Sequence, residues 1–164
     1  MNAFRAKDAP SAVRIMGRCA FSPLDRREWR AALGAMLAAA RACPCAEPPQ
    51  VVLYLLNDAR MARANARHMG CPGPTNILSF PGGTDSPGEL LLSLDTLRRE
   101  CLLYGQDGRR HAVRLLAHGM GHLCGLDHGP EMEALSDIFM RAAHAAGLDG
   151  PARGVPPASD SASP

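Results

Sequence analysis

The chain has 164 residues, of which 46% are hydrophobic and only 4% aromatic, so its core must rest mainly on aliphatic side chains. A chain of this length is most simply one domain with a substantial core. The formal net charge of +2 is too small to indicate nucleic-acid binding by itself. The sequence shows neither a signal-peptide pattern nor an apolar stretch long enough to span a bilayer. We therefore expect a cytoplasmic protein with reduced cysteines and no membrane partner.

The first part of the chain predicts two strands with a helix between them. A short apolar run at 12–16 predicts the first strand. Ser22 and Pro23 predict the N-cap and the first position of a helix that runs to about residue 42. The continuous aliphatic run at 51–56 predicts a buried strand.

A second helix is predicted to begin after Asn57 and to reach Met69. Its three arginines follow helical spacing and therefore share one face: Arg60, Arg63 and Arg67. Such a face is either a solvated surface without further function or a surface for phosphate groups, which suit the guanidinium fork.

The rest of the chain predicts two more strands and three more helices. Strands are expected at 75–80 and 89–94, separated by a loop of Gly, Pro and Ser. A third helix, capped by Asp95 or Thr96, should reach about residue 104. A fourth helix carries two histidines, and a final helix begins at Gly129-Pro130 and ends near residue 147.

These elements predict an α+β fold in which a small mixed β-sheet of about four strands packs with about five helices. Residues 1–148 are expected to form a single domain. Residues 149–164 consist mainly of Pro, Ser, Ala and Gly without periodicity, which predicts a disordered tail.

Three of the six histidines fall within one short segment: His118, His122 and His128. The first two lie one helical turn apart on the same face. Gly125 can adopt the left-handed conformation that ends a helix, so the chain can turn back and bring His128 to the others. Three neutral imidazoles leave the fourth position of a tetrahedral site open, as catalytic zinc requires. The spacing predicts one zinc ion per chain, held on a helix and the following turn.

The residues beside the histidines disfavour a peptidase. The zinc-peptidase helix places Glu, the general base, directly after its first histidine. Gly119 occupies that position here, and Gly125-Leu-Asp-His128 differs from the extended peptidase motif. Cys124 is expected to be a small packing residue rather than a ligand.

The motifs resemble those of the YbeY family, the metal-dependent bacterial endoribonucleases of ribosomal RNA maturation. Segment 118–128, HGMGHLCGLDH, is similar to the family pattern H-G-x-L-H-L-x-G-[YF]-D-H at all three histidines. Segment 74–81, PTNILSFP, resembles the family block P-T-[DN]-V-L-S-F-P, and Gly88-Glu89-Leu90 resembles the Gly-Asp-Ile start of a strand. The resemblance spans about residues 50–147. It implies an α+β fold, one zinc held by the three histidines and a groove for single-stranded RNA.

The chain departs from the family pattern in three places. Gly121 stands where the family usually has Leu, and Leu126 where it has an aromatic residue. The family's functional arginine follows an Asn, and aligning Asn65 with that Asn puts Met69 at the arginine position. Either Arg67 reaches the same place through a shifted loop, or the chain has lost a phosphate-contacting group.

The resemblance implies a single-strand-specific, metal-dependent endoribonuclease. It would act in ribosomal RNA processing, at the 3′ end of 16S rRNA, and in ribosome quality control, with ribosomal proteins as further candidate partners. Two alternatives remain open. One is a zinc-stabilised ribosome-assembly or RNA-binding factor without significant catalysis, and the other is a zinc hydrolase of a different substrate.

Several side chains are candidates for work beside the metal ligands. Arg67 and Ser79 are the candidate catalytic side chains. Thr75 and Asn76 are candidates for lining the RNA groove, and Asp127 is expected to orient a ligand histidine. The sequence does not indicate an oligomeric state.

Overall fold

The computed structural model describes residues 12–18, 20–44 and 50–148, which form a four-stranded mixed sheet and five α-helices. The strands are β1 (Val13–Met16), β2 (Val51–Leu56), β3 (Ile77–Phe80) and β4 (Gly88–Ser93). The helices are α1 (Arg26–Arg41), α2 (Asp58–Met69), α3 (Leu94–Tyr104), α4 (Gly108–Leu123) and α5 (Pro130–Ala143), followed by the π-helical turn η1 (His144–Leu148). This confirms the predicted fold class. The tail predicted for 149–164 lies outside the described residues.

The sheet has the strand order β1-β2-β4-β3. β1, β2 and β4 are parallel, with Val13 opposite Val51 and Val51 opposite Gly88. β3 runs antiparallel to β4 at the edge, with Ile77 opposite Leu92. A Cβ on Gly82, in the loop between these two strands, would lie 2.4 Å from the carbonyl oxygen of Ser86, so this loop needs glycine.

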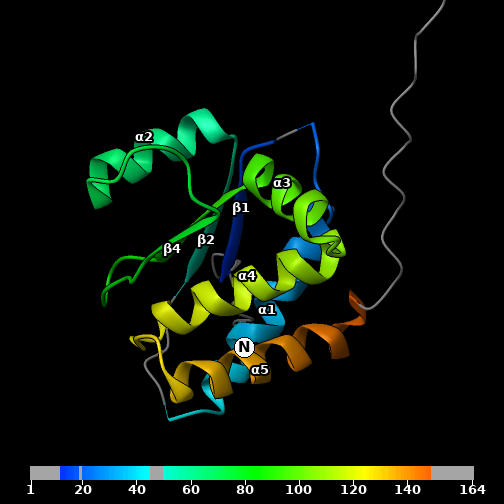
Figure 1. Cartoon of the computed structure of the whole chain (residues 1–164). Helices are drawn as coiled ribbons and strands as arrows, with labels where there is room; N and C mark the ends of the chain where they lie inside the picture. The colour runs from blue at the N-terminus through cyan, green and yellow to red at the C-terminus, as the bar shows by residue number, and fades with distance from the viewer. Residues whose placement is uncertain (1–11, 19, 45–49, 149–164) are drawn as a thin grey trace, which may run out of the picture.

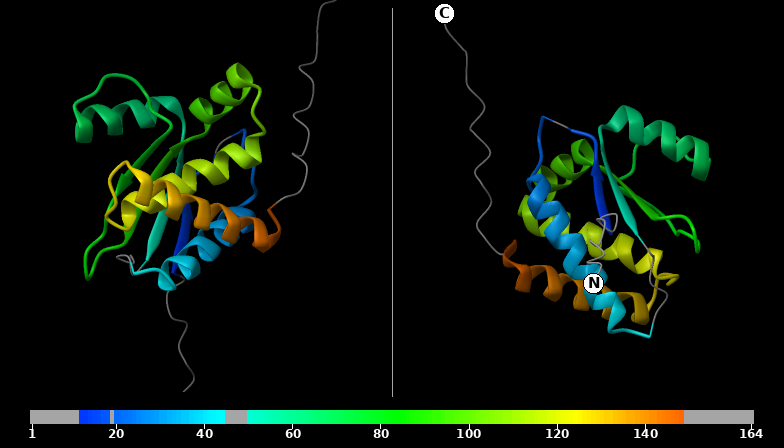
Figure 2. Two further views of the ribbon diagram at one scale, coloured as in Figure 1. Left: turned by 60° about the horizontal axis from the view of Figure 1, so that its bottom comes forward. Right: turned by 180° about the vertical axis from the view of Figure 1, so that it is seen from behind.

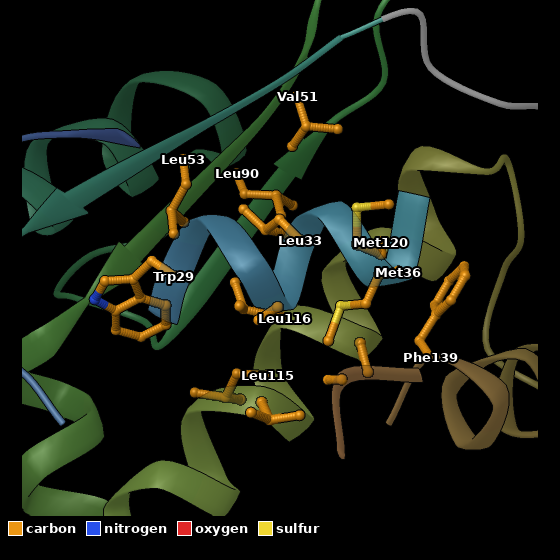
Figure 3. Packing of buried hydrophobic residues seen from close by; sticks show 14 of the residues in the cluster. Trp29, Leu33, Met36, Val51, Leu53, Leu90, Leu115, Leu116, Met120 and Phe139 are labelled. Carbon is orange, nitrogen blue, oxygen red and sulfur yellow. The ribbon is translucent and has the colours of Figure 1, made fainter. Parts of the chain in front are cut away.

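The helices cover the two faces of the sheet unequally. The sheet lies between α2 on one side and α1, α4 and α5 on the other (Figures 1 and 2). Trp29 and Leu33 of α1 are almost fully buried against the sheet and α4 (Figure 3). Met120 of α4 and Phe139 of α5 complete the same core. No helix in the described ranges has the length and apolar character needed to cross a bilayer.

The predicted start of the first helix is wrong. α1 begins at Arg26, because Asp25 is its N-cap and forms a capping box with Glu28. The Asp25 carboxylate accepts a hydrogen bond from the Glu28 N–H at 2.9 Å, and the Glu28 carboxylate accepts one from the Asp25 N–H at 2.8 Å. Ser22 instead binds a core side chain, since its hydroxyl accepts a hydrogen bond from Trp29 Nε1 at 3.0 Å.

The caps of the next two helices agree with the sequence in one case only. Asn57 caps α2 as predicted, and its side chain accepts from the Arg60 N–H at 3.0 Å. α3 is capped by Ser93, not by Asp95 or Thr96. Ser93 is the last residue of β4, so strand and helix adjoin without a linker and the cap lies inside the predicted strand.

Candidate metal centre

Helix α4 is pressed against the sheet where the histidines begin. A Cβ on Gly119 would lie 2.8 Å from Ile77 Cδ1 and Leu90 Cδ2, and 3.1 Å from Ser79 Oγ. Glycine therefore allows α4 to approach β3 and β4 closely, and this approach brings His118 beside the edge strand. Glycine inside a helix lowers helix stability by about 1 kcal/mol relative to alanine. Alanine at position 119 would collide with Ile77 and Leu90, which explains why glycine is present.

The three predicted histidines converge. The ring centroids of His118 and His122 are 4.8 Å apart, those of His118 and His128 5.2 Å, and those of His122 and His128 4.9 Å. One ring nitrogen of each lies within 4.8 Å of those of the others. Gly125, with a φ of 82°, makes the left-handed turn that the sequence predicted and returns His128 to the helix. The cluster can hold a metal ion.

A backbone carbonyl sets the orientation of His122. Its Nδ1 lies 2.9 Å from the carbonyl oxygen of Leu126, which can only accept, so Nδ1 carries the proton and donates. Nε2 of His122 is then the nitrogen with a lone pair for a metal. Asp127 was expected to orient a ligand histidine, but for His122 the acceptor is the neighbouring backbone carbonyl.

The environment of His118 favours its neutral form. Burial lowers the pKa of His118 below its ordinary value, and the adjacent His122 and His128 lower it further. A neutral imidazole is the form that binds a metal.

The histidines open onto a cleft with a volume of about 880 Å³. One wall comes from α4 and the turn after it, and the other from the segment that leads into and forms β3. The lining residues are Met69, Thr75, Asn76, Ile77, Leu78, Ser79, Pro81, Arg114, Leu115, His118, His122, Gly125, Leu126, Asp127 and His128. The second family-like sequence block therefore faces the histidine motif across the cleft.

The candidate residues from the sequence occupy different places around this cleft. Ser79 and Thr75 line it. Asn76 also lines it, but its side-chain amide already donates to Glu100 Oε1 at 3.0 Å. The lining residues include Met69 and do not include Arg67, which lies exposed in the last turn of α2. Met69, at the position aligned with the family's arginine, thus lines the cleft and brings an uncharged thioether side chain where the family has a cation.

The departure at Gly121 is matched by a side chain from α5. A Cβ on Gly121 would lie 2.2 Å from Met132 Sδ and 2.9 Å from Met132 Cε. Met132 is 3% exposed and occupies the space that a side chain at 121 would need. Met132 of α5 thus fills the space beside position 121, where the family pattern has Leu.

The charged residue Arg114 was not identified from the sequence as part of the cleft. Arg114 lines the cleft and lies four residues before His118 on α4. The i,i+4 spacing that joined the histidines also places this arginine on their face of the helix. This spacing can be read from the sequence, but only the arginines of α2 were considered as phosphate contacts.

The architecture and the cleft define a small α+β domain with a histidine cluster able to hold a metal ion. Residues 19–146 match the family described as Endoribonuclease YbeY. The chain belongs to this family, as the motifs predicted.

Individual relatives agree with this assignment. The chain is 45% identical over 116 residues to an Endoribonuclease YbeY of Nitratidesulfovibrio vulgaris, covering 57% of this chain and 72% of the relative. It is 39% identical over 146 residues to an Endoribonuclease YbeY of Oleidesulfovibrio alaskensis, covering 74% and 84%. A solution structure of a Thermotoga maritima protein shares the fold, with a TM-score of 0.64 and 17% identity over 88% of this chain and 97% of that protein.

Proposed function

We propose that this chain is a metal-dependent endoribonuclease that holds one zinc ion through His118, His122 and His128 and cleaves single-stranded RNA in ribosomal RNA maturation. The observation that carries the proposal is the convergence of three imidazoles on one wall of a cleft, in a chain of an endoribonuclease family.

The donor set fits zinc. Three neutral imidazoles are a known set of protein ligands for catalytic zinc, and they leave a position open for water or substrate. Nε2 of His122 is available to a metal because Nδ1 is held by the carbonyl oxygen of Leu126. When bound, the ion supplies Lewis-acid polarisation of a phosphoryl oxygen and activation of water.

The walls of the cleft suit a nucleic-acid strand. A volume of about 880 Å³ admits a nucleotide with its flanking phosphates. Thr75 and Ser79 line the wall opposite the histidines, and their hydroxyls can donate to phosphate oxygens. We assign this phosphate contact to Ser79 because its Oγ lies next to Gly119, the residue after the first histidine.

A peptide substrate fits the site less well. Gly119 supplies no carboxylate, and a side chain there would collide with Ile77 and Leu90. The general base of a zinc peptidase therefore has no room at its usual position on α4.

Arg67 is proposed to contact RNA outside the cleft. The ring of its neighbour His68 packs edge-on against Phe80 of β3 at 5.0 Å between centroids. The end of α2 therefore lies beside the strand that forms one wall of the cleft. An exposed arginine there can meet phosphates that flank the cleavage site, with a contribution that weakens as salt rises.

The test is cleavage of a structured ribosomal RNA precursor by the zinc-loaded protein, with the triple variant His118→Ala, His122→Ala, His128→Ala as control. We expect cleavage in single-stranded regions by the wild type and none above background by the variant. Circular dichroism verifies that both proteins are folded. RNA binding by the wild type without metal-dependent cleavage would support an assembly factor and contradict the proposal.

A further inference from the structure

The cleft contains one cationic side chain among the described residues that line it, and it comes from α4. Arg114 lines the cleft, while Arg67 and the other arginines of the described ranges do not. A site that receives an RNA strand needs a positive group near the phosphate in addition to the metal, because each phosphate carries a full negative charge. Arg114 is in place to supply it.

The guanidinium of Arg114 is held from one side only. Its Nη2 donates to Gln106 Oε1 and, at 2.8 Å, to Nδ1 of His111. Its Nη1 and Nε make no hydrogen bond within 12–18, 20–44 and 50–148, and the residue is exposed. The Nη1 and Nε hydrogens therefore stay free, and each can donate a charge-assisted hydrogen bond to an anion.

A partly buried network of hydrogen bonds fixes the orientation of His111, the partner of Arg114. Arginine can only donate, so Nδ1 of His111 accepts and Nε2 carries the proton. Nε2 then donates to Glu100 Oε2 at 2.6 Å, and the other oxygen of Glu100 accepts from the Asn76 amide at 3.0 Å. His111 is 6% exposed. This network links both walls of the cleft, because Asn76 lies on one and Arg114 on the other.

We propose that Arg114 is the phosphate-binding side chain of the cleft, and that Gln106 and the His111–Glu100 pair position its guanidinium. The proposal deepens the ribonuclease function and rests on it. Arg114 precedes His118 by one helical turn, a rise of about 6 Å along the axis. Arg114 and His118 line the same cleft, so the free Nη1 and Nε hydrogens can contact a phosphate of a strand that also passes the histidines.

The first experiment removes the charge. Arg114→Gln should lower kcat/KM for a single-stranded RNA oligonucleotide by about ten- to a hundredfold, the effect of one lost charged hydrogen bond. Zinc content and melting temperature should not change. Arg114→Lys should recover part of the loss, since it keeps the charge without the fork. Arg30→Gln is the matched control: it removes the same charge from an exposed position on α1 that does not line the cleft.

The second experiment tests positioning. Gln106→Ala should lower kcat/KM severalfold in the wild-type background and have no further effect in the Arg114→Gln background, because Gln106 acts through Arg114. An equal loss in both backgrounds would show that Gln106 acts elsewhere and would overturn this part of the proposal. His111→Ala, measured in the same two backgrounds, should show the same dependence.

A third measurement separates this proposal from the proposed function. Fluorescence anisotropy with a single-stranded DNA of the same sequence reports phosphate binding without cleavage. Arg114→Gln should weaken binding and reduce the salt dependence of log K by about 0.7, the value for one phosphate contact on a single strand. If the wild type fails to cleave RNA while this shift is seen, the enzyme assignment fails and the phosphate contact stands. If Arg114→Gln matches Arg30→Gln in both assays, the proposal for Arg114 is overturned.

Discussion

Glu28 and Arg109 join the first turns of α1 and α4 through a hydrogen bond of 2.8 Å between Oε1 and Nη2. The arginine side chain is only 6% exposed, and its Nε has no partner among the described residues. The Glu28 carboxylate therefore offsets much of the free-energy cost of burying the guanidinium charge. The hydrogen bond from Arg109 holds the pKa of Glu28 below its ordinary value, against the opposing effect of burial. The ion pair thus fixes the helix that carries the histidines to the helix that organises the core.

Removing this carboxylate should destabilise the protein strongly. Glu28→Ala leaves the buried guanidinium of Arg109 without its counter-ion, and we expect a loss of about 3 kcal/mol in the free energy of unfolding, measured by urea denaturation. The double variant Glu28→Ala, Arg109→Met should be more stable than Glu28→Ala alone, because the unpaired charge is gone. Simple additivity of the two single effects would show that the pair is not coupled.

Asp58 predicts a loss of stability in acid. Burial alone would raise the pKa of Asp58, but hydrogen bonds from Arg99, Thr96 and Ser93 outweigh it and hold the pKa below its ordinary value. A folded-state pKa below the unfolded one gives stability that is present above the unfolded pKa and lost as pH falls through the folded pKa. Urea midpoints from neutral to acid pH should therefore fall less steeply for Asp58→Asn than for the wild type.

The control for this pH series is Asp85→Asn, at an exposed position in the loop between β3 and β4. It should leave the slope at its wild-type value. A wild-type slope in Asp58→Asn would contradict the assignment of acid sensitivity to this carboxylate.

Metal content should depend on the histidine cluster alone. His122→Ala removes one of the three proposed ligands, and elemental analysis after dialysis should show near-complete loss of zinc. His68→Ala and His144→Ala should retain about one zinc per chain, because neither residue belongs to the cluster. Stoichiometric zinc in His122→Ala, or a thiolate ligand found by X-ray absorption, would disprove an open three-histidine site.

Gly121 and Met132 should be energetically coupled. Alanine in place of a helical glycine gains about 1 kcal/mol of helix propensity. In the wild type this gain is opposed, since the new Cβ would meet Met132 Sδ at 2.2 Å. In a Met132→Ala background the obstacle is gone, so Gly121→Ala should stabilise that protein by about 1 kcal/mol. The same change in the wild type should give a smaller gain or a loss, and the difference between the two effects is the coupling energy. The four proteins are compared by urea denaturation, and a zero coupling would contradict the packing.

The sequence predicted those features that depend on neighbours in the chain. The three histidines lie within one short segment, so helical spacing and one left-handed Gly125 were sufficient to bring them together. Strand and helix identities followed from hydrophobic runs. The start of α1 was not predicted correctly, because Ser22 and Asp25 are both suitable N-cap residues. In the structure the Ser22 hydroxyl accepts a hydrogen bond from Trp29, and Asp25 is the cap.

Features that depend on contacts between distant segments could not be predicted from the sequence. The match of Gly121 with Met132 needs the packing of α5 on α4. The orientation of Arg114 depends on His111 and, through it, on Glu100 in the preceding helix. The sequence gives the identity of these residues, but their hydrogen bonds and packing contacts follow only from the tertiary structure.

The short span of the histidine cluster also bears on the unfolded chain. His118, His122 and His128 are separated by so few residues that an unfolded segment can bring at least two imidazoles to one ion at little cost in loop entropy. Zinc that binds the unfolded chain offsets part of the stabilisation that it gives to the folded one. Metal should therefore raise the melting temperature by less than its affinity for the native site implies, and it can bind the nascent chain before β3 and α4 have met.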